Sequence, residues 1–160
     1  MSTVYLGLGS NIDARANTSS GIDVLRQTFD RVECSPVYQT AAFGFKGNDF
    51  INLVAAVETD MSPLELKHFL TGLEDRHDRD RQSPKFSDRT LDIDILLYDD
   101  LYLISPELGI PRGEILEAAY VLKPLADLAP DLIHPVARKT MGELWNAFPV
   151  KDVELVPVEL

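Results

Sequence analysis

The sequence predicts an α+β fold of the split β-α-β kind, in which helices pack on a mainly antiparallel sheet. Expected strands and helices follow one another in the order β-α-β-β-α-β, with further short helices after them. The second expected helix also has a strong start signal, in which a serine, a proline and a glutamate combine. With 160 residues and 45% hydrophobic residues the chain can bury a sizeable core, and we expect a single domain over residues 1–160.

The N-terminal part predicts a strand, a helix and a second strand. Residues 4–9 are expected to form a central strand, because Gly7 and Gly9 would let a neighbour approach one of its faces closely. Residues 13–29 carry apolar side chains at helical spacing and predict a helix. Residues 32–40 then predict the second strand.

The next two elements are a strand over residues 50–58 and a helix that begins after Ser62. The strand has a strongly apolar middle, with the polar Asn52 near its start. Ser62 is the expected N-cap, and Glu65 completes a capping box. Glu74 borders the buried stripe near the end of this helix, where a negative charge is unfavourable for the helix dipole. That position hints at another task for Glu74, although a flanking surface glutamate is the simpler interpretation.

The fourth strand of the core, over residues 92–98, is the most informative stretch. Alternation predicts two opposite faces: Leu91, Ile93, Ile95 and Leu97 on one, and Asp92, Asp94, Leu96 and Tyr98 on the other. Because residues two apart on a strand are about 6.6 Å apart, the two carboxylates would lie side by side. Their charges repel each other, so one or two bound Mg²⁺ ions would stabilise the pair and make it chemically useful.

Towards the C-terminus the pattern predicts short helices near residues 114–119, 121–128 and 140–148, and a last edge strand over residues 152–157.

A basic run precedes the acidic strand. It holds five of the chain's 15 lysines and arginines: Arg76, Arg79, Arg81, Lys85 and Arg89. The net charge of −11 argues against a general nucleic-acid binder, so this local cluster is more informative than it would be in a basic protein. Carboxylates that hold metal, beside arginines that hold phosphate, indicate phosphoryl-type chemistry. A solvated helix end and loop is the alternative interpretation of the basic run taken alone.

The composition also sets the expected surroundings of the protein. No stretch approaches the roughly 20 apolar residues that a membrane span needs, and the N-terminus lacks a secretory signal pattern. The single cysteine, Cys34, excludes a disulfide framework and a cysteine zinc site. The composition therefore favours a cytoplasmic protein without a nucleic-acid or membrane partner. We also expect a monomer, although the composition does not decide this.

Three blocks of the sequence carry a family resemblance. They are residues 6–11 (LGLGSN), residues 89–96 (RTLDIDIL) and residues 129–135 (APDLIHP). The middle block reads R-x-x-D-hydrophobic-D-hydrophobic-hydrophobic, which is quite specific. Together, and with matching spacing, the blocks resemble the 6-hydroxymethyl-7,8-dihydropterin pyrophosphokinase family over nearly the whole chain. That family has a ferredoxin-like β-α-β-β-α-β core, which is the plan predicted above.

The resemblance implies a reaction in folate biosynthesis. A pyrophosphoryl unit would pass from ATP to the hydroxymethyl oxygen of the dihydropterin, and AMP would leave. The resemblance implies that Asp92 and Asp94 hold two Mg²⁺ ions. It also makes Arg79 and Arg89 catalytic, because they would balance charge on the transferred group.

The resemblance also implies two binding sites. The substrate-binding residues would be Thr40, Ala41, Phe43, Phe50, Asn52 and Tyr120. The nucleotide-binding residues would be Glu74, Arg81, Phe86, Arg89, Ile95 and Arg112. Asn52 would read the edge of the pterin, while Phe50 and Tyr120 would stack on its faces, which suits a flat heterocycle rich in donors and acceptors.

The chain departs from the family pattern mainly on the nucleotide side. Ser87-Asp88 replaces Gly-Pro, Phe86 replaces tryptophan, Glu107 replaces a basic residue, Arg112 replaces histidine and Ala118 replaces arginine. Either Arg112, whose fork suits phosphate, takes over part of the lost contacts, or nucleotide binding is weakened or redirected.

Two other functions stay open on the sequence. One is a diverged pterin-binding paralogue with lost or altered nucleotide use, which the changed nucleotide residues motivate. The other is a nucleotidyltransferase of the Gly-Ser…Asp-x-Asp type, to which Gly9-Ser10 and the acid pair would belong. In that class the two elements lie closer in sequence than they do here.

Overall fold

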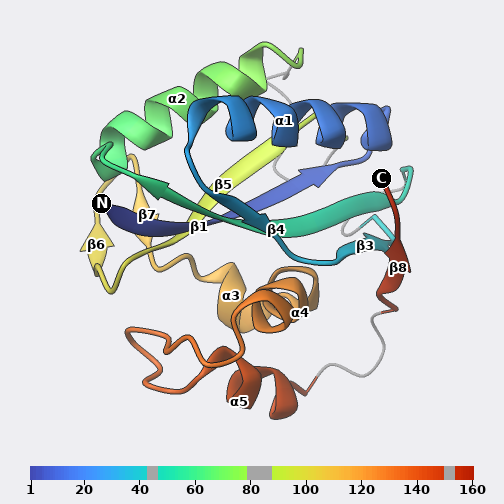
Figure 1. Cartoon of the computed structure of the whole chain (residues 1–160). Helices are drawn as coiled ribbons and strands as arrows, with labels where there is room; N and C mark the ends of the chain where they lie inside the picture. The colour runs from blue at the N-terminus through green and yellow to red at the C-terminus, as the bar shows by residue number, and fades with distance from the viewer. Residues whose placement is uncertain (43–46, 79–87, 150–153) are drawn as a thin grey trace.

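The computed structural model describes residues 1–42, 47–78, 88–149 and 154–160. Its main sheet has the strand order β5-β1-β4-β3-β8, and β2 also pairs with β4 (Figure 1). The elements in chain order are β1 (Ser2–Ser10), α1 (Ala14–Thr28), β2 (Val32–Cys34), β3 (Val37–Thr40), β4 (Phe50–Thr59), α2 (Pro63–Asp75), β5 (Asp92–Tyr98), β6 (Leu103–Ile104), β7 (Gly109–Ile110), α3 (Glu114–Glu117), α4 (Ala119–Leu128), α5 (Met141–Asn146) and β8 (Val156–Val158).

The pairing confirms the predicted α+β plan. β1 lies between β4 and β5 and is antiparallel to both, so β4 and β5 run parallel with β1 between them. Helix α2 connects β4 to β5, and α1 leads from β1 towards β2 and β3, which pair with the far side of β4. These are two split β-α-β units, the arrangement of a ferredoxin-like core.

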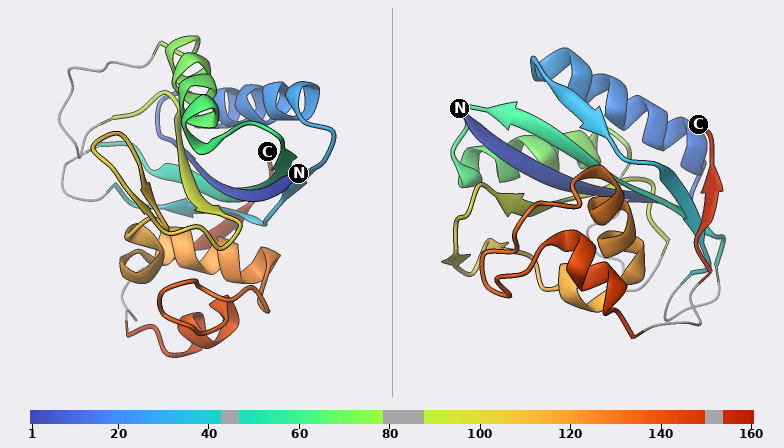
Figure 2. Two further views of the ribbon diagram at one scale, coloured as in Figure 1. Left: turned by 90° about the vertical axis from the view of Figure 1, so that its left-hand side faces the viewer. Right: turned by 60° about the horizontal axis from the view of Figure 1, so that its bottom comes forward.

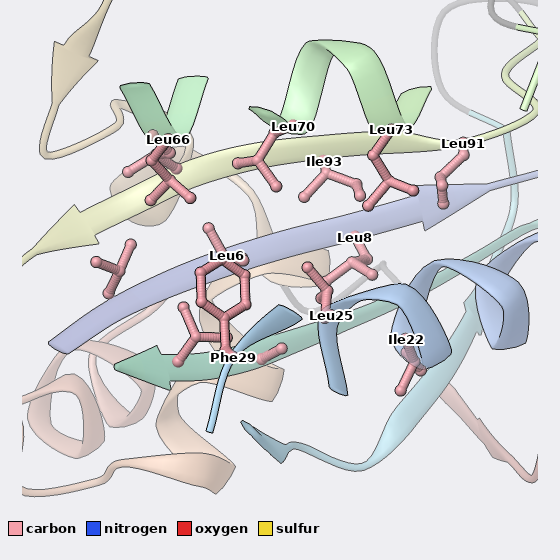
Figure 3. Packing of buried hydrophobic residues seen from close by; sticks show 14 of the residues in the cluster. Leu6, Leu8, Ile22, Leu25, Phe29, Leu66, Leu70, Leu73, Leu91 and Ile93 are labelled. Atoms are coloured by element: carbon pink, nitrogen blue, oxygen red, sulfur yellow. The ribbon is translucent and has the colours of Figure 1, made fainter. Parts of the chain in front are cut away.

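Helices cover both faces of the sheet. α1 and α2 lie on one face, and α3, α4 and α5 lie on the other, as Figures 1 and 2 show from three sides. On the first face, leucines of α2 meet Leu6 of β1 and Ile93 of β5 in one hydrophobic cluster (Figure 3). A second cluster joins Val54 of β4 and Leu96 of β5 to Leu122 of α4. A fully buried side chain of this size contributes about 1.5–3 kcal/mol, so both helix layers are firmly attached to the sheet.

The start of α2 is as the sequence predicts. The Ser62 hydroxyl accepts a hydrogen bond from the Glu65 N–H at 3.2 Å, and the Glu65 carboxylate accepts one from the Ser62 N–H at 3.2 Å. Pro63 occupies the first helical position. This capping box satisfies donors that a helix otherwise leaves without partners, and it sets the direction in which α2 crosses the sheet.

Two expectations about strands need correction. The single strand expected over residues 32–40 is two strands, β2 and β3, because Pro36 has no N–H to continue a ladder. In β5 the pairing with β1 shifts between Tyr5 and Leu6, which leaves Leu96 opposite no residue of β1.

This bulge changes which side chains share a face of β5. Ile93 and Ile95 pack in the first cluster, as expected. Beyond the bulge, Leu97 packs with Leu96 in the second cluster, whereas Tyr98 packs against the first. The expected places of Leu97 and Tyr98 are therefore wrong, because one extra residue in a strand reverses the alternation after it.

The C-terminal elements agree with expectation in kind and differ at their ends. Three short helices and a last edge strand are present, and α5 starts at a second capping box between Thr140 and Glu143. In the part of the chain that the structure describes, no helix has the length and apolar character needed to cross a bilayer.

Candidate active site

β5 lies at one edge of the described sheet and carries the acid pair beside two glycines of β1. Asp92 is paired with Gly9, and Asp94 with Gly7. On its other side, Gly9 is paired with Asn52 of β4. Directly opposite residues of an antiparallel pair share a face, so Asp92 and Asn52 flank Gly9 on the same face.

Glycine at position 9 keeps the centre of this face open. A Cβ atom on Gly9 would lie 2.9 Å from Asn52 Oδ1, closer than ordinary side-chain contacts allow. The missing side chain therefore makes a flat floor between the carboxylate of Asp92 and the amide of Asn52. A planar ligand fits over such a floor more readily than a bulky one.

The Asn52 amide is held in one orientation. Its Nδ2 donates a hydrogen bond to Thr40 Oγ1 at 3.1 Å, and both residues are buried. Thr40 is paired with Phe50, so both lie on the same face of the sheet as Asn52. The exposed Ala41 directly follows Thr40 at the end of β3. Three of the predicted substrate-binding residues, Thr40, Phe50 and Asn52, thus come together at one end of β3 and β4.

Tyr120 belongs to the helix layer that packs on the acid-pair face of the sheet. It stands in the first turn of α4 and is half-buried. Burial raises the pKa of its hydroxyl, and the charges of Glu114, Asp94 and Asp92 raise it further. The helix layer that contains α4 packs on the face of the sheet opposite α1 and α2, which is also the face of the acid pair.

The carboxylates of Asp92 and Asp94 repel each other unless a positive charge lies close to them. Burial, followed by the charge of Asp92, raises the pKa of the Asp94 carboxyl from 3.8 to about 7, and the charge of Arg112 acts in the opposite direction. Arg112 Nη2 lies 3.7 Å from Asp94 Oδ1. The same guanidinium also forms an ion pair with Glu114. A cation at Asp94 is therefore favourable, which suits a metal ligand.

Asn11 fixes the backbone that leads into β5. Its Oδ1 accepts a hydrogen bond from the N–H of Arg89 at 2.7 Å, and its Nδ2 donates to Asp88 Oδ1 at 2.7 Å. Nδ2 also donates to the carbonyl of Asn48 at 3.1 Å, two residues before β4 begins. Sequence reasoning did not single out this role, although Asn11 ends the first family block. Asp88, which stands where the family has proline, is thus bound by Asn11.

Glu74 is 6% exposed, so its interpretation as a flanking surface glutamate is wrong. Its Oε2 accepts a hydrogen bond from the Ile93 N–H at 2.8 Å, on the outer edge of β5. Ile95 is 2% exposed and packs in the cluster under α2, on the face opposite the acid pair. Any contact between Ile95 and a nucleotide would have to come from its backbone.

A comparison with protein families bears on this arrangement. The family described as 7,8-dihydro-6-hydroxymethylpterin-pyrophosphokinase (HPPK) matches residues 5–130. The chain belongs to the HPPK family. Its members are named as pyrophosphokinases, which are enzymes.

Named HPPK relatives cover almost the whole chain. The 2-amino-4-hydroxy-6-hydroxymethyldihydropteridine pyrophosphokinase of Pseudomonas aeruginosa is 37% identical over 158 residues, which are 96% of each chain. The enzyme of the same name from Aquifex aeolicus is 34% identical over 145 residues, 89% of this chain and 90% of its own.

Solved structures show the same fold. The wild-type HPPK-DHPS of Plasmodium falciparum matches with a TM-score of 0.70 at 15% identity, over 91% of this chain and 40% of that one. An HPPK-DHPS solved in complex with substrates matches with a TM-score of 0.70 at 12% identity, over 92% of this chain and 43% of that one. This HPPK-family chain thus spans about two fifths of those larger proteins.

Four of the predicted site residues lie outside the described part of the chain: Phe43, Arg79, Arg81 and Phe86. Arg89 is described and is 8% exposed. Among the described residues, no group of three histidines, cysteines, aspartates or glutamates could enclose a metal. Two carboxylates on one strand fit Mg²⁺, which is commonly bound through one or two carboxylates together with water and substrate phosphates.

Proposed function

We propose that the protein transfers the pyrophosphoryl group of ATP to the hydroxymethyl oxygen of 6-hydroxymethyl-7,8-dihydropterin and releases AMP. Membership of the HPPK family supports the reaction class and its place in folate biosynthesis. The single observation that carries the proposal is the row formed by Asp92, Gly9 and Asn52 across three strands. It sets a candidate metal ligand and a candidate pterin reader on either side of an open floor.

The pterin would lie over Gly9. Asn52 would exchange hydrogen bonds with the polar edge of the ring, because Thr40 holds its amide in one orientation. Phe50 and Tyr120 would stack on the two ring faces. Ala41 and Phe43 complete the proposed pocket. This placement directs the hydroxymethyl group towards Asp92 and Asp94.

The acid pair would hold two Mg²⁺ ions together with the phosphates of ATP. When bound, the metal supplies positive charge that neutralises the triphosphate and favours ionisation of the pterin hydroxyl. Asp94 would then be fully ionised, because a cation opposes the burial and the repulsion that raise its pKa. The protein's own contribution is to hold two carboxylates side by side on a rigid strand.

The arginines would stabilise the charge that develops on the transferred group. Arg89 enters β5 on a backbone that Asn11 holds by hydrogen bonds, so less freedom has to be lost when its side chain meets a phosphate. Arg79 would act with it on the reacting phosphates. The nucleotide would be held by Glu74, Arg81, Phe86, Ile95 and Arg112, together with Arg89.

One assay tests this function. Purified protein is incubated with the dihydropterin, Mg²⁺ and either ATP or GTP, and the nucleotide products are separated by chromatography. We expect AMP and pyrophosphorylated pterin, with ATP preferred and with no product when EDTA is present. Pterin binding without AMP release would instead indicate the diverged paralogue, and release of pyrophosphate from ATP would indicate nucleotidyl transfer.

We further propose that residues 1–160 form one domain and that the protein acts as a monomer in the cytoplasm, on small molecules and without a nucleic-acid partner. Light scattering during size-exclusion chromatography measures the oligomeric state directly. A mass of 17.8 kDa is expected. Twice that value would contradict the monomer.

A further inference from the structure

Arg112 lies between two carboxylates that belong to different parts of the fold. Its Nη2 is 3.7 Å from Asp94 Oδ1 of β5, and its Nε contacts Glu114 in the first turn of α3. The Arg112 N–H donates to the carbonyl of Leu96 at 3.0 Å, and the Arg112 carbonyl accepts from the Ile115 N–H at 3.2 Å. The backbone is thus held on both sides, and the guanidinium contacts both carboxylates at once.

The surroundings of Asp94 are rich in negative charge. Asp92, Glu74 and Glu114 all act on its carboxyl in the same direction, and Arg112 opposes them. The side chains of Asp94 and Arg112 are 28% and 35% exposed, so solvent reaches the pair and ligands can approach it. Arg112 and a metal ion would therefore compete for the same carboxylate.

We propose that Arg112 is an exchangeable counter-ion: it pairs with both Asp94 and Glu114 when no metal is bound, and when Mg²⁺ takes Asp94 it keeps Glu114 and turns to a nucleotide phosphate instead. The inference rests on the proposed metal site at Asp92 and Asp94. A divalent ion and a guanidinium repel each other at one carboxylate. Glu114 already contacts Arg112, so the exchange needs no new partner on the protein.

The exchange couples metal binding to nucleotide binding. A phosphate attracts the planar fork of Arg112 and draws it away from Asp94, which leaves that carboxylate to the metal. Metal alone has to displace Arg112 without this help. The protein should therefore bind Mg²⁺ weakly by itself and more tightly together with a nucleotide, beyond the affinity of the ion for the nucleotide alone.

The test is calorimetric titration of Mg²⁺, and of Mn²⁺ followed by electron paramagnetic resonance, into full-length protein without nucleotide. We expect Arg112→Gln to tighten metal binding by roughly fivefold, the effect of losing one partly exposed ion pair that competes with the metal. At saturating Mg²⁺ the same variant should bind a non-hydrolysable ATP analogue more weakly than wild type. Opposite changes for metal and nucleotide are the expected signature.

Arg31→Gln is the matched control. Arg31, just before β2, is a more exposed arginine that also lies between two carboxylates, 3.7 Å from Glu33 of β2 and 3.9 Å from Glu58 of β4, away from the acid pair. Its loss should leave metal affinity unchanged. Glu114→Gln should weaken metal binding more in the wild-type background than once Arg112 is glutamine, because only in the wild type does Glu114 also act by holding Arg112.

The outcomes distinguish a failure of the counter-ion role of Arg112 from a failure of the proposed metal site. Wild-type protein that binds metal at Asp94, with unchanged affinity in Arg112→Gln, overturns the counter-ion and leaves the metal site standing. Wild-type protein that binds no metal, with or without nucleotide, overturns the proposed metal site itself. Weaker metal binding in Arg112→Gln would show that Arg112 assists the metal and would also overturn the exchange.

Discussion

Replacing Asp94 by asparagine tests the electrostatic strain of the acid pair. Burial and the charge of Asp92 raise the pKa of the Asp94 carboxyl from 3.8 to about 7 in the folded protein. The folded state therefore holds this proton more tightly than the unfolded chain does. The stabilisation that results is fully present below the unfolded pKa, near pH 4, and is lost as the pH rises through about 7.

The magnitude follows from the pKa difference. About 3 pKa units, at about 1.36 kcal/mol each, set an upper limit of about 4 kcal/mol. The Asp94 side chain is 28% exposed, so screening by water reduces this value. We expect metal-free Asp94→Asn to be more stable than wild type by about 1–2 kcal/mol above pH 8, and the difference to shrink towards pH 4.

Urea unfolding in EDTA, followed by circular dichroism at several pH values, measures this difference. Asp100→Asn, an exposed aspartate in the turn after β5, is the control and should show no such trend. Added Mg²⁺ should stabilise the wild type and not Asp94→Asn, because only the wild type keeps the metal carboxylate. A variant that is less stable than wild type at high pH, or a difference that does not depend on pH, would refute the reasoning.

Three further predictions concern Gly9 of β1, Glu74 at the outer edge of β5 and His134 in the loop before α5. Gly9→Ala should raise the dissociation constant for dihydropterin, measured calorimetrically, because the new Cβ displaces Asn52 Oδ1; Gly72→Ala, at an open helix position, is the control. Glu74→Ala should cost about 1–3 kcal/mol of unfolding free energy in urea, because it leaves the buried Ile93 N–H without its acceptor; an unchanged midpoint would contradict this. Burial lowers the pKa of His134, whose Nδ1 accepts hydrogen bonds from two backbone N–H groups. The stability that neutral His134 contributes is therefore present above about pH 6.5 and is lost as the pH falls through the folded-state pKa. His134→Gln should remove this part of the acid sensitivity, so that the free energy of unfolding depends less steeply on pH.

The sequence by itself determined the order of elements and the main chemical candidates. The capping box at Ser62, the paired glycines of β1 and the alternation around Asp92 and Asp94 are local patterns, and local patterns are readable because backbone geometry repeats over two to four residues. They predicted the α+β plan correctly, and the signature around Arg89 predicted the family.

Tertiary structure decided which of these residues meet. The register of three strands sets Asp92, Gly9 and Asn52 in one row, and no local pattern encodes register between segments so far apart in the chain. The bulge at Leu96 reversed the alternation that the sequence predicted for the end of β5. It is an extra residue relative to a partner strand, so it exists only once that partner is in place.

The partners of Glu74, Asn11 and Arg112 were likewise decided by tertiary structure. Glu74 looked like a surface residue because its neighbour, the edge of β5, is distant in the sequence. The role of Asn11 was not visible for the same reason, because Asp88 and Arg89, to which it is hydrogen-bonded, are also distant in the sequence. In the sequence Arg112 only stands where the family has a histidine, whereas in the folded protein its guanidinium lies against Asp94 and Glu114. Common polar side chains such as these acquire defined partners only when distant chain segments pack together, because packing determines which charges and hydrogen-bond donors they meet.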